Sequence, residues 1–435
     1  MRNFLDTRFH ISERGSTISH EIIGGLVTAL SMLYILVTNA GILSSAGMDY
    51  TMLIAATALA TGVGTLLSAF ISNTPTGLST GLGVDAFFSF TLCLTIGYTW
   101  QQALAITFIS GLIFLIIMLT PLRNKIVDAI PASLKRAISV GIGLFIALIG
   151  LFNSGIVETA NGLLTMGNIT HGAPLLAIIG IIITVLLMIF KVKGAILIGI
   201  IATTIIGIPM GITNVTITDY HLIPISSFFM KMQFGGLMQY GIITLLTSIF
   251  SLLILDIFDS VGTLTGIMSE CNMIDENGNV KDKTMTKALI ADAAATCTGA
   301  MLNVSTCTNF VEASSGVAAG ARTGLAAVIT ALVFFLSYFF APVFSIIPLA
   351  STTAALVIVG VLMFKNVKYI NWEDLEVAIP CFLTIAFMPF AYSISAGIGV
   401  GIISYTLIKL VRRKFKEIHP LMYILSILFI LMFIL

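Results

Sequence analysis

Long apolar runs separated by short polar loops are the feature that most limits what this chain can fold into. A membrane-spanning helix needs roughly 20 mostly apolar residues, and about 14 runs meet that need. They lie near residues 21–43, 51–71, 80–96, 101–120, 133–153, 174–190, 194–211, 240–266, 284–301, 304–320, 323–347, 352–364, 375–391 and 392–410. Only 9% of the residues are charged, whereas a soluble domain is about 25% charged. We therefore predict an all-α polytopic membrane protein embedded in lipid.

Polar segments divide this series of spans into parts. Residues 1–20 precede the first span, and a linker over 212–239 separates a seven-span set at 21–211 from a second set at 240–410. Residues 411–435 form a basic tail that ends in a short apolar run, Leu421–Leu435. That run is shorter than a typical membrane-spanning helix. Two placements therefore stay open: it crosses the membrane, or it lies at the membrane interface.

Positive charge gathers in alternate loops. If the N terminus is cytoplasmic, so are the loops after spans 4, 6, 8, 10 and 12. These loops contain Arg123, Lys125, Lys135, Arg136, Lys191, Lys193, Lys281, Lys283, Lys287, Arg322, Lys365 and Lys368. The opposite loops carry almost no Lys or Arg, with Lys231 as the exception. This asymmetry follows the positive-inside rule and predicts a cytoplasmic N terminus.

The third span of each set is interrupted. In residues 72–90, Pro75 and several glycines precede Asp85, and in residues 303–320 a run of Ser, Thr and Asn precedes Glu312. Two sets of seven spans would be related by inversion, and matched breaks in such repeats are pointers to a binding site. We therefore predict a 7+7 inverted repeat with short strand-like breaks in spans 3 and 10.

Four carboxylates lie in the broken or interrupted spans: Asp85, Asp256, Asp259 and Glu312. An Asp at membrane depth costs roughly 2.5–3.5 kcal/mol on insertion scales, and no Lys or Arg lies mid-span to neutralise these acids. Asp256 and Asp259 share nearly one helical face. Carboxylates in one low-dielectric cavity cannot all stay ionised. We therefore expect at least one to titrate near working pH, as a proton-coupled carrier requires.

The same acids indicate a class of substrate. A carboxylate accepts hydrogen bonds through two oxygens, so it suits a neutral planar molecule with adjacent N–H donors, such as a nucleobase. Phe87, Phe88 and Phe310 lie close by in sequence and would stack on a flat ring. We predict that the substrate is bound between the broken segments by Glu312, Asp85, Phe87 and Thr308.

Other functions would leave patterns that this sequence lacks. GLGVDA at residues 81–86 has neither the spacing nor the context of a dinucleotide fingerprint, and no Walker sequence exists. The five cysteines show no metal-binding spacing, and no nucleophile elbow is found. The net charge of +1 gives no reason to expect a nucleic-acid partner. We expect no enzymatic activity, no cofactor and no metal.

Five stretches, taken together and in order, resemble a known family. They are RGSTISHEIIGGLVTALSMLYILVTNAGILSSAGMD (14–49), IPASLKRAISVGIGLFIALIGLFNSGIV (130–157), LDIFDSVGTLTG (255–266), STCTNFVEASSGVAAGARTGLAAV (305–328) and IPCFLTIAFMPFAYSISAGIGVGIISY (379–405). From Asp6 to the C terminus, the chain resembles the AzgA-like hypoxanthine/guanine/adenine permeases of the nucleobase–ascorbate (NCS2) transporter group.

This resemblance implies a core domain of spans 1–4 and 8–11 and a gate domain of spans 5–7 and 12–14. It implies proton symport of hypoxanthine, guanine or adenine across the plasma membrane, and commonly a homodimer formed through the gate domain. Asp256 falls at the family's span-8 substrate acid and Asp259 at its span-8 acid linked to transport. The resemblance therefore adds Asp256 to the expected substrate-binding residues and implies that Asp259 and Asp256 couple transport to protons. Glu312 falls at its purine-binding acid in span 10.

Three departures from the family pattern touch the predicted site. Span 3 has Asp85 where the family usually has Asn, Asn303-Val304 replaces Gly-Thr, and Ala313 replaces Ser. Aspartate only accepts hydrogen bonds, whereas asparagine also donates. We hypothesise that Asp85 shifts preference toward a base with an extra donor, such as the amino group of adenine or guanine. Transport of another planar solute (uracil or xanthine) and coupling to sodium remain alternatives.

Overall fold

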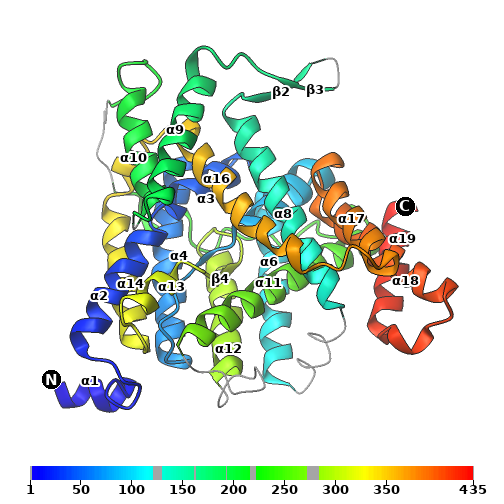
Figure 1. The fold of residues 1–435 in the computed structure, drawn as a ribbon, viewed down its shortest axis with the longest axis horizontal. Helices are drawn as coiled ribbons and strands as arrows, with labels where there is room; N and C mark the ends of the chain where they lie inside the picture. Colours follow the sequence, from blue (N-terminus) through cyan, green and yellow to red (C-terminus); the bar gives the residue numbers. More distant parts are fainter. Residues whose placement is uncertain are drawn as a thin grey trace.

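Helices dominate the computed structural model of the chain, which describes residues 2–120, 130–160, 163–192, 194–215, 222–271 and 284–434 (Figure 1). The first half contains α1 (Arg2–Phe9), α2 (Ile18–Met32), α3 (Ile35–Leu43), η1 (Ser44–Ala46), α4 (Tyr50–Ile71), β1 (Leu78–Thr80), α5 (Leu82–Ala86), η2 (Phe87–Ile96), α6 (Trp100–Leu119), α8 (Ala132–Asn153), β2 (Val157–Ala160), β3 (Leu163–Met166), α9 (Gly172–Ile189) and α10 (Ala195–Gly207). The second half contains η3 (Ile225–Ser227), α11 (Ile242–Glu270), α12 (Thr284–Met301), β4 (Cys307–Asn309), α13 (Ala313–Ala318), α14 (Gly324–Phe339), α15 (Ala341–Phe344), α16 (Leu349–Phe364), η4 (Lys365–Tyr369), α17 (Leu375–Phe390), α18 (Ile394–Val411), η5 (Phe415–Glu417) and α19 (Pro420–Ile434).

Every predicted span is occupied by helix. Among the described residues, eight helices are long and apolar enough to cross a membrane, and shorter apolar helices accompany them. Spans 3 and 10 are the ones that strands interrupt, β1 in the first and β4 in the second. The predicted all-α membrane fold with strand-like breaks at these two positions is therefore confirmed.

The limits of several spans differ from those expected; span 11, for example, divides into α14 and α15. Span 1 divides at Leu33–Tyr34 into α2 and α3, and span 8 continues as α11 to Glu270. The apolar run marks only the depth of the hydrocarbon layer, so a helix that continues into the polar interface is longer than its run. Helix starts follow local capping: the Asp49 carboxylate accepts from the N–H of Met52 at the start of α4.

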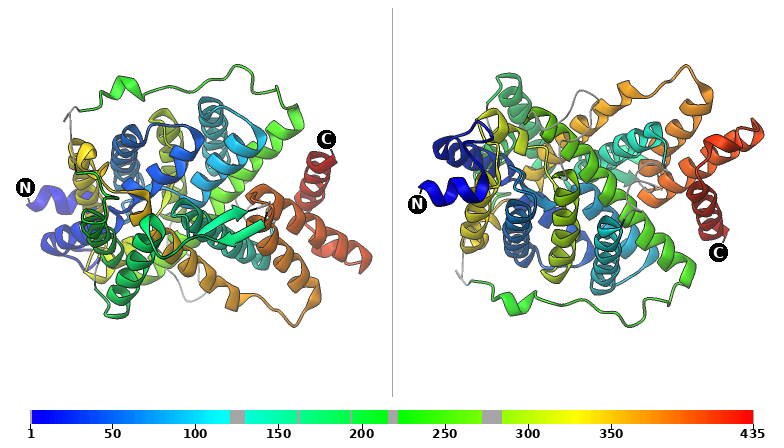
Figure 2. Two further views of the ribbon diagram at one scale, coloured as in Figure 1. Left: turned by 90° about the horizontal axis from the view of Figure 1, so that it is seen from above. Right: turned by 90° about the horizontal axis from the view of Figure 1, so that it is seen from below.

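The helices pack in two groups (Figure 2). In the core group, α4 packs against α12 and α14, α2 against α14, and α6 against α12. In the gate group, α8 packs along α16 and α17, α17 along α18, and α9 along α10 and α16. Small residues permit this closeness: a Cβ on Gly360 of α16 would lie 2.5 Å from the carbonyl oxygen of Gly143 of α8.

A hairpin that the sequence analysis did not predict follows α8. Its strands β2 and β3 are antiparallel, with Val157 opposite Met166 and Ala160 opposite Leu163, and it extends away from the helices at the top of Figure 1. Each strand has only four residues, which is too short for an alternating apolar pattern to stand out.

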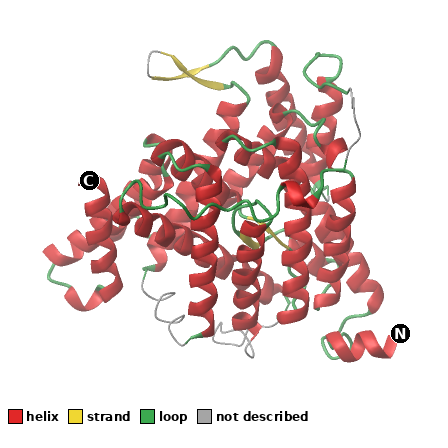
Figure 3. Ribbon diagram, turned by 180° about the vertical axis from the view of Figure 1, so that it is seen from behind, coloured by secondary structure: helices red, strands yellow, loops and turns green. Residues whose placement is uncertain are grey.

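The predicted linker and the basic tail also have defined contacts. The linker follows the core group, where its Ile223 carbonyl accepts from the Tyr338 hydroxyl at 2.6 Å. At the tail, α19 packs against α18 and α11, and the C terminus lies on the opposite side of the molecule from the N terminus (Figure 3). Its 15 residues measure about 22 Å along the axis, which is less than the thickness of a hydrocarbon layer. Linker residues 216–221 and the loop residues Arg123, Lys125, Lys193, Lys281 and Lys283 lie outside the described residues.

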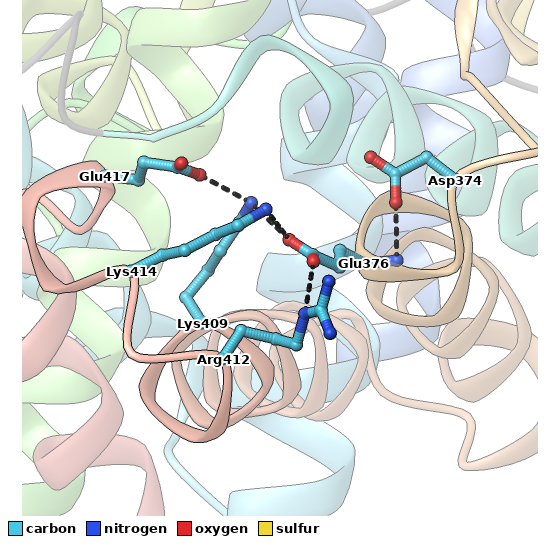
Figure 4. A network of polar contacts seen from close by, with 6 residues as sticks. All are labelled: Asp374, Glu376, Lys409, Arg412, Lys414 and Glu417. Carbon is cyan, nitrogen blue, oxygen red and sulfur yellow. Dashed lines mark hydrogen bonds and ion pairs between the residues drawn. The ribbon is translucent and has the colours of Figure 1, made fainter.

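One carboxylate joins the ends of two gate helices (Figure 4). Glu376, in the first turn of α17, accepts from Lys409 Nζ at 2.9 Å, Arg412 Nε at 2.8 Å and Lys414 Nζ at 2.7 Å. Lys409 also donates to Glu417 at 2.7 Å, and this ammonium holds the pKa of Glu417 below its usual range. Glu417 therefore stays ionised at neutral pH, and the contact is lost only in acid.

Replacing Glu376 by glutamine is expected to destabilise the protein. The side chain of Lys409 is 8% exposed, so the loss of one of its two carboxylate partners weakens the contact between α17 and α18. Because Lys409 keeps Glu417, we expect a lower unfolding midpoint rather than loss of the fold. Thermal unfolding of the purified protein measures it. The control is Glu373→Gln at a nearby exposed acid, and an equal unfolding midpoint for the two variants would contradict the prediction.

Candidate substrate site at the two broken spans

The breaks in spans 3 and 10 meet and pair with each other. β1 and β4 run antiparallel, with Leu78 opposite Asn309, Ser79 opposite Thr308 and Thr80 opposite Cys307. The ladder continues at one end, where the N–H of Phe310 donates to the Gly77 carbonyl at 3.0 Å. Segments that lie more than 200 residues apart thus satisfy each other's backbone at a depth where water is scarce.

Threonines on the preceding spans hold each strand in the same way. The Thr65 hydroxyl of α4 donates to the carbonyl of Leu78 and accepts from the N–H of the same residue, both at 3.0 Å. The Thr296 hydroxyl of α12 lies in the same position at Cys307, where it accepts from the N–H at 3.3 Å and lies 3.2 Å from the carbonyl oxygen. Spans 2 and 9 occupy equivalent positions in the two halves, so this repeated contact is what an inverted duplication produces.

Two of the four predicted acids have accessible surface beside the strands. Glu312 is half-buried, and its carboxylate accepts a hydrogen bond at 2.6 Å from the hydroxyl of Tyr34, the residue directly before α3. The Asp259 carboxylate is exposed, although Asp256 and Ser260 on the same helix are buried. Asp259 accepts from the Thr308 hydroxyl of β4 at 3.1 Å. Strand β4 and the residues after it therefore carry or contact both accessible carboxylates.

The close approach of the end of β1 to Thr308 and Asp259 depends on the glycine that follows the strand, Gly81. A Cβ on Gly81 would lie 3.1 Å from Thr308 Cγ2 and 3.5 Å from Asp259 Oδ2. Any side chain at this position would press on the hydrogen bond between Thr308 and Asp259.

Asp256 lies behind the strands, in a buried polar network. Its Oδ2 accepts from Thr296 at 2.8 Å, while its Oδ1 is buried without a hydrogen-bond partner. Asp292 of α12 accepts from Ser260 of α11 at 2.5 Å and from Asn309 of β4 at 2.9 Å. These hydrogen bonds join α11, α12 and β4. Thr296 lies between Asp256 and β4.

Asp85 bridges the two breaks from the other side. It lies on α5, is fully buried, and accepts a hydrogen bond at Oδ1 from the Ser305 hydroxyl. Its Oδ2 is buried without a hydrogen-bond partner. Among the described residues, none of the four predicted acids forms an ion pair.

Comparison with known proteins decides the family. A profile described as the permease family (Xan_ur_permease) matches residues 19–400. The chain belongs to this family. The permease is a multi-pass membrane transporter rather than an enzyme, as predicted, and its resemblance to the hypoxanthine/guanine/adenine branch is confirmed by its relatives.

The relatives match over nearly their whole length. The permease is 41% identical to the guanine/hypoxanthine permease PbuG of Bacillus subtilis, with 99% of each chain covered. It is 34% identical to the adenine permease AdeQ of Escherichia coli, covering 99% of this chain and 96% of that protein. Among solved structures, the transmembrane domain of the cyanobacterial bicarbonate transporter BicA superposes with a TM-score of 0.65 at 15% identity, covering 87% of this chain and 97% of that one. This likeness confirms the predicted 7+7 inverted-repeat fold.

Unlike Glu312 and Asp259, the aromatic residues near the breaks are buried. Phe87 and Phe88 of η2 are fully buried and pack in the main hydrophobic cluster of the permease. Phe310 is also buried. Their ring faces are covered by protein in this conformation, because the segment that follows Asp85 is apolar and turns into the core. Stacking of Phe87 on the substrate stays a prediction.

Sequence reasoning missed three residues that shape the site: Tyr34, Thr65 and Thr296. The two threonines had a signal, because each lies on the span directly before a break, in equivalent positions of the two halves. Tyr34 had none: it lies in an apolar run, and only the packing of span 1 against span 10 places its hydroxyl on Glu312.

Proposed function

We propose that the permease imports a purine nucleobase (adenine, guanine or hypoxanthine) by proton symport. The observation that carries the proposal is the pair of accessible carboxylates, Glu312 and Asp259, beside the crossed strands. The relatives named for guanine/hypoxanthine and adenine transport support the choice of substrate.

The chemistry of Glu312 supports a neutral base with adjacent N–H donors. Its Oε1 accepts from Tyr34, and carboxylate oxygens have further acceptor capacity. Two parallel N–H···O bonds to one carboxylate fix the orientation of a planar ligand. Thr308, between β1 and Asp259, donates its hydroxyl hydrogen to Asp259, and its oxygen keeps acceptor capacity.

The arrangement of the acids on α11 supports proton coupling. Asp259 is accessible and touches β4, whereas Asp256, one turn away, is buried against Thr296. A proton taken up at Asp259 would remove a charge directly beside the strand that carries Thr308. Substrate and proton would then each favour the binding of the other, with one reciprocal coupling free energy.

The placement of this machinery in the cell follows the charge pattern. We propose that the N terminus is cytoplasmic, since Lys and Arg gather in the alternate loops on its side. The core and gate groups would act as the core and gate domains, with a homodimer formed through the gate domain in the plasma membrane.

Uptake measurements test the proposal. Cells without their own purine carriers would receive radiolabelled adenine, guanine, hypoxanthine and uracil at pH 6 and pH 8, with and without a protonophore, and with sodium replaced by choline. We expect uptake of a purine that falls at pH 8 and collapses with the protonophore. Absence of purine uptake by well-expressed protein would overturn the substrate, and uptake that follows sodium would overturn the coupling ion.

Asp85→Asn is expected to change the relative uptake of the three purines by about tenfold, the effect of one charged hydrogen bond of roughly 1.5 kcal/mol. The change would reach the site through Ser305, which donates to Asp85 next to the β4 segment. Competition assays measure it, with Ser305→Ala as the companion variant. Unchanged discrimination in Asp85→Asn would refute a role for this residue in selectivity.

A further inference from the structure

A cavity lies against the β2–β3 hairpin, which contributes Thr159 and Leu164 to its lining. Its volume is about 430 Å³, within the range of small-molecule sites. It is lined by Leu148, Phe152, Thr159, Leu164, Pro389, Phe390 and Tyr392. None of these side chains is charged, and three are aromatic rings, so the lining suits a flat, uncharged ring rather than an ion.

The ring of Tyr392 lies at the centre of an aromatic cluster. Its centroid is 5.5 Å from Phe90, 5.3 Å from Phe145 and 6.0 Å from Phe152, with each pair close to edge-to-face. Phe145 and Phe152 belong to α8 of the gate group, whereas Phe90 belongs to η2, which contacts both α6 of the core group and α18 of the gate group. The cluster therefore lies at the boundary between the two groups.

Tyr392 has an unusual backbone for a large side chain. Its φ is +52°, in the left-handed region that bulky residues rarely adopt. It lies between the end of α17 and Ser393, which caps α18, where glycine or asparagine is the ordinary choice. Residues held in such conformations concentrate at functional sites. Here the conformation directs the ring into the cluster and against the cavity.

The cluster is also continuous with the central site along the chain. Phe90 lies on η2, a π-helical segment that follows Asp85 and α5 directly, and α5 follows β1. π-Helical turns are rare and are frequent at functional sites. The α5 helix and the start of η2 therefore join the strand crossing to the aromatic cluster along the chain.

We propose that this cavity is an outer subsite for a planar aromatic solute, which stacks on Tyr392 before it passes to the central acids. The inference rests on the proposed function for the identity of the solute, a nucleobase. It assigns to Tyr392 a binding role in a place separate from Glu312.

A fluorescent reporter tests the subsite in the full-length protein. Phe390 lines the cavity and is 82% exposed, so Phe390→Trp adds an indole there with little disturbance of packing. Phe382→Trp is the matched control, because Phe382 lies on the same helix, is 60% exposed and does not line the cavity. The probe is adenine, and wild-type protein gives the signal of native Trp100 and Trp372.

We expect adenine to quench the Phe390→Trp reporter saturably, and to quench it equally when Glu312→Gln is added. Tyr392→Leu should weaken this quenching about tenfold, the effect of losing one base–aromatic stack, while Tyr392→Phe should preserve it.

Loss of quenching with Glu312→Gln would show one central site and overturn the subsite. So would an unquenched reporter in protein that still takes up purines. Absence of purine uptake by wild-type protein would instead overturn the proposed function. If Phe390→Trp does not fold, a tenfold higher KM for uptake in Tyr392→Leu than in Tyr392→Phe gives the same test, and equal KM values overturn the subsite.

Discussion

Replacing Glu312 by glutamine is expected to reduce purine binding at least a hundredfold and to abolish uptake. A carboxylate offers two acceptor oxygens, whereas a carboxamide offers one acceptor and one donor. The amide would face a base N–H with its own N–H. Hydrogen bonds to charged groups are worth roughly 1.5–3 kcal/mol each. One of the two is replaced by a contact between two donors and the other becomes a weaker neutral bond, so the total loss amounts to about 3 kcal/mol. That corresponds to about a hundredfold, since each 1.4 kcal/mol is tenfold.

Equilibrium binding of radiolabelled purine to purified protein measures this effect. Tyr34→Phe is the informative companion, because it removes only the 2.6 Å hydrogen bond that orients Glu312. We expect it to weaken binding about tenfold. If Glu312→Gln bound purine within threefold of wild type, Glu312 would not be the recognition group, and the proposed orientation of the base would be wrong.

Asp259→Asn is expected to separate binding from active transport. Asparagine keeps an oxygen that can accept from Thr308, which lies 3.1 Å from the aspartate, but it cannot take up or release a proton. Purine binding should therefore stay within a few-fold of wild type. Uptake driven by a proton gradient should fall at least tenfold and lose its pH dependence.

Proteoliposomes distinguish the two processes. Exchange of labelled for unlabelled purine needs only binding and reorientation of the site, while accumulation needs the proton gradient. Wild-type protein is the control, and Thr308→Val is the companion variant, because it removes the hydrogen bond to Asp259 and leaves the carboxylate. Gradient-driven accumulation by Asp259→Asn at the wild-type rate, with wild-type pH dependence, would show that the proton is carried elsewhere, with Asp256 the next residue to test.

The exposure of the four acids separates roles that the sequence could not. Asp256 and Asp259 are alike in sequence, three residues apart on one apolar span. In the structure Asp259 is accessible and contacts β4, while Asp256 is buried against α12. The difference arises because α11 presents successive turns to different neighbours. Which neighbour each turn meets depends on the packing of spans that are remote in sequence.

The sequence by itself determined the number and place of the spans, the two breaks, and the four acids within them. These features are local: the transfer of an apolar run into lipid, and the cost of a carboxylate there, depend on neighbouring residues alone. Only the tertiary structure decided that β1 pairs with β4, that Tyr34 donates to a carboxylate 278 residues away, and that Phe87 is buried while Tyr392 faces a cavity. Those outcomes depend on which faces of the helices meet when the two halves of the chain pack together. A span that is buried on most sides is apolar all round, so its sequence pattern does not indicate which face contacts which neighbour.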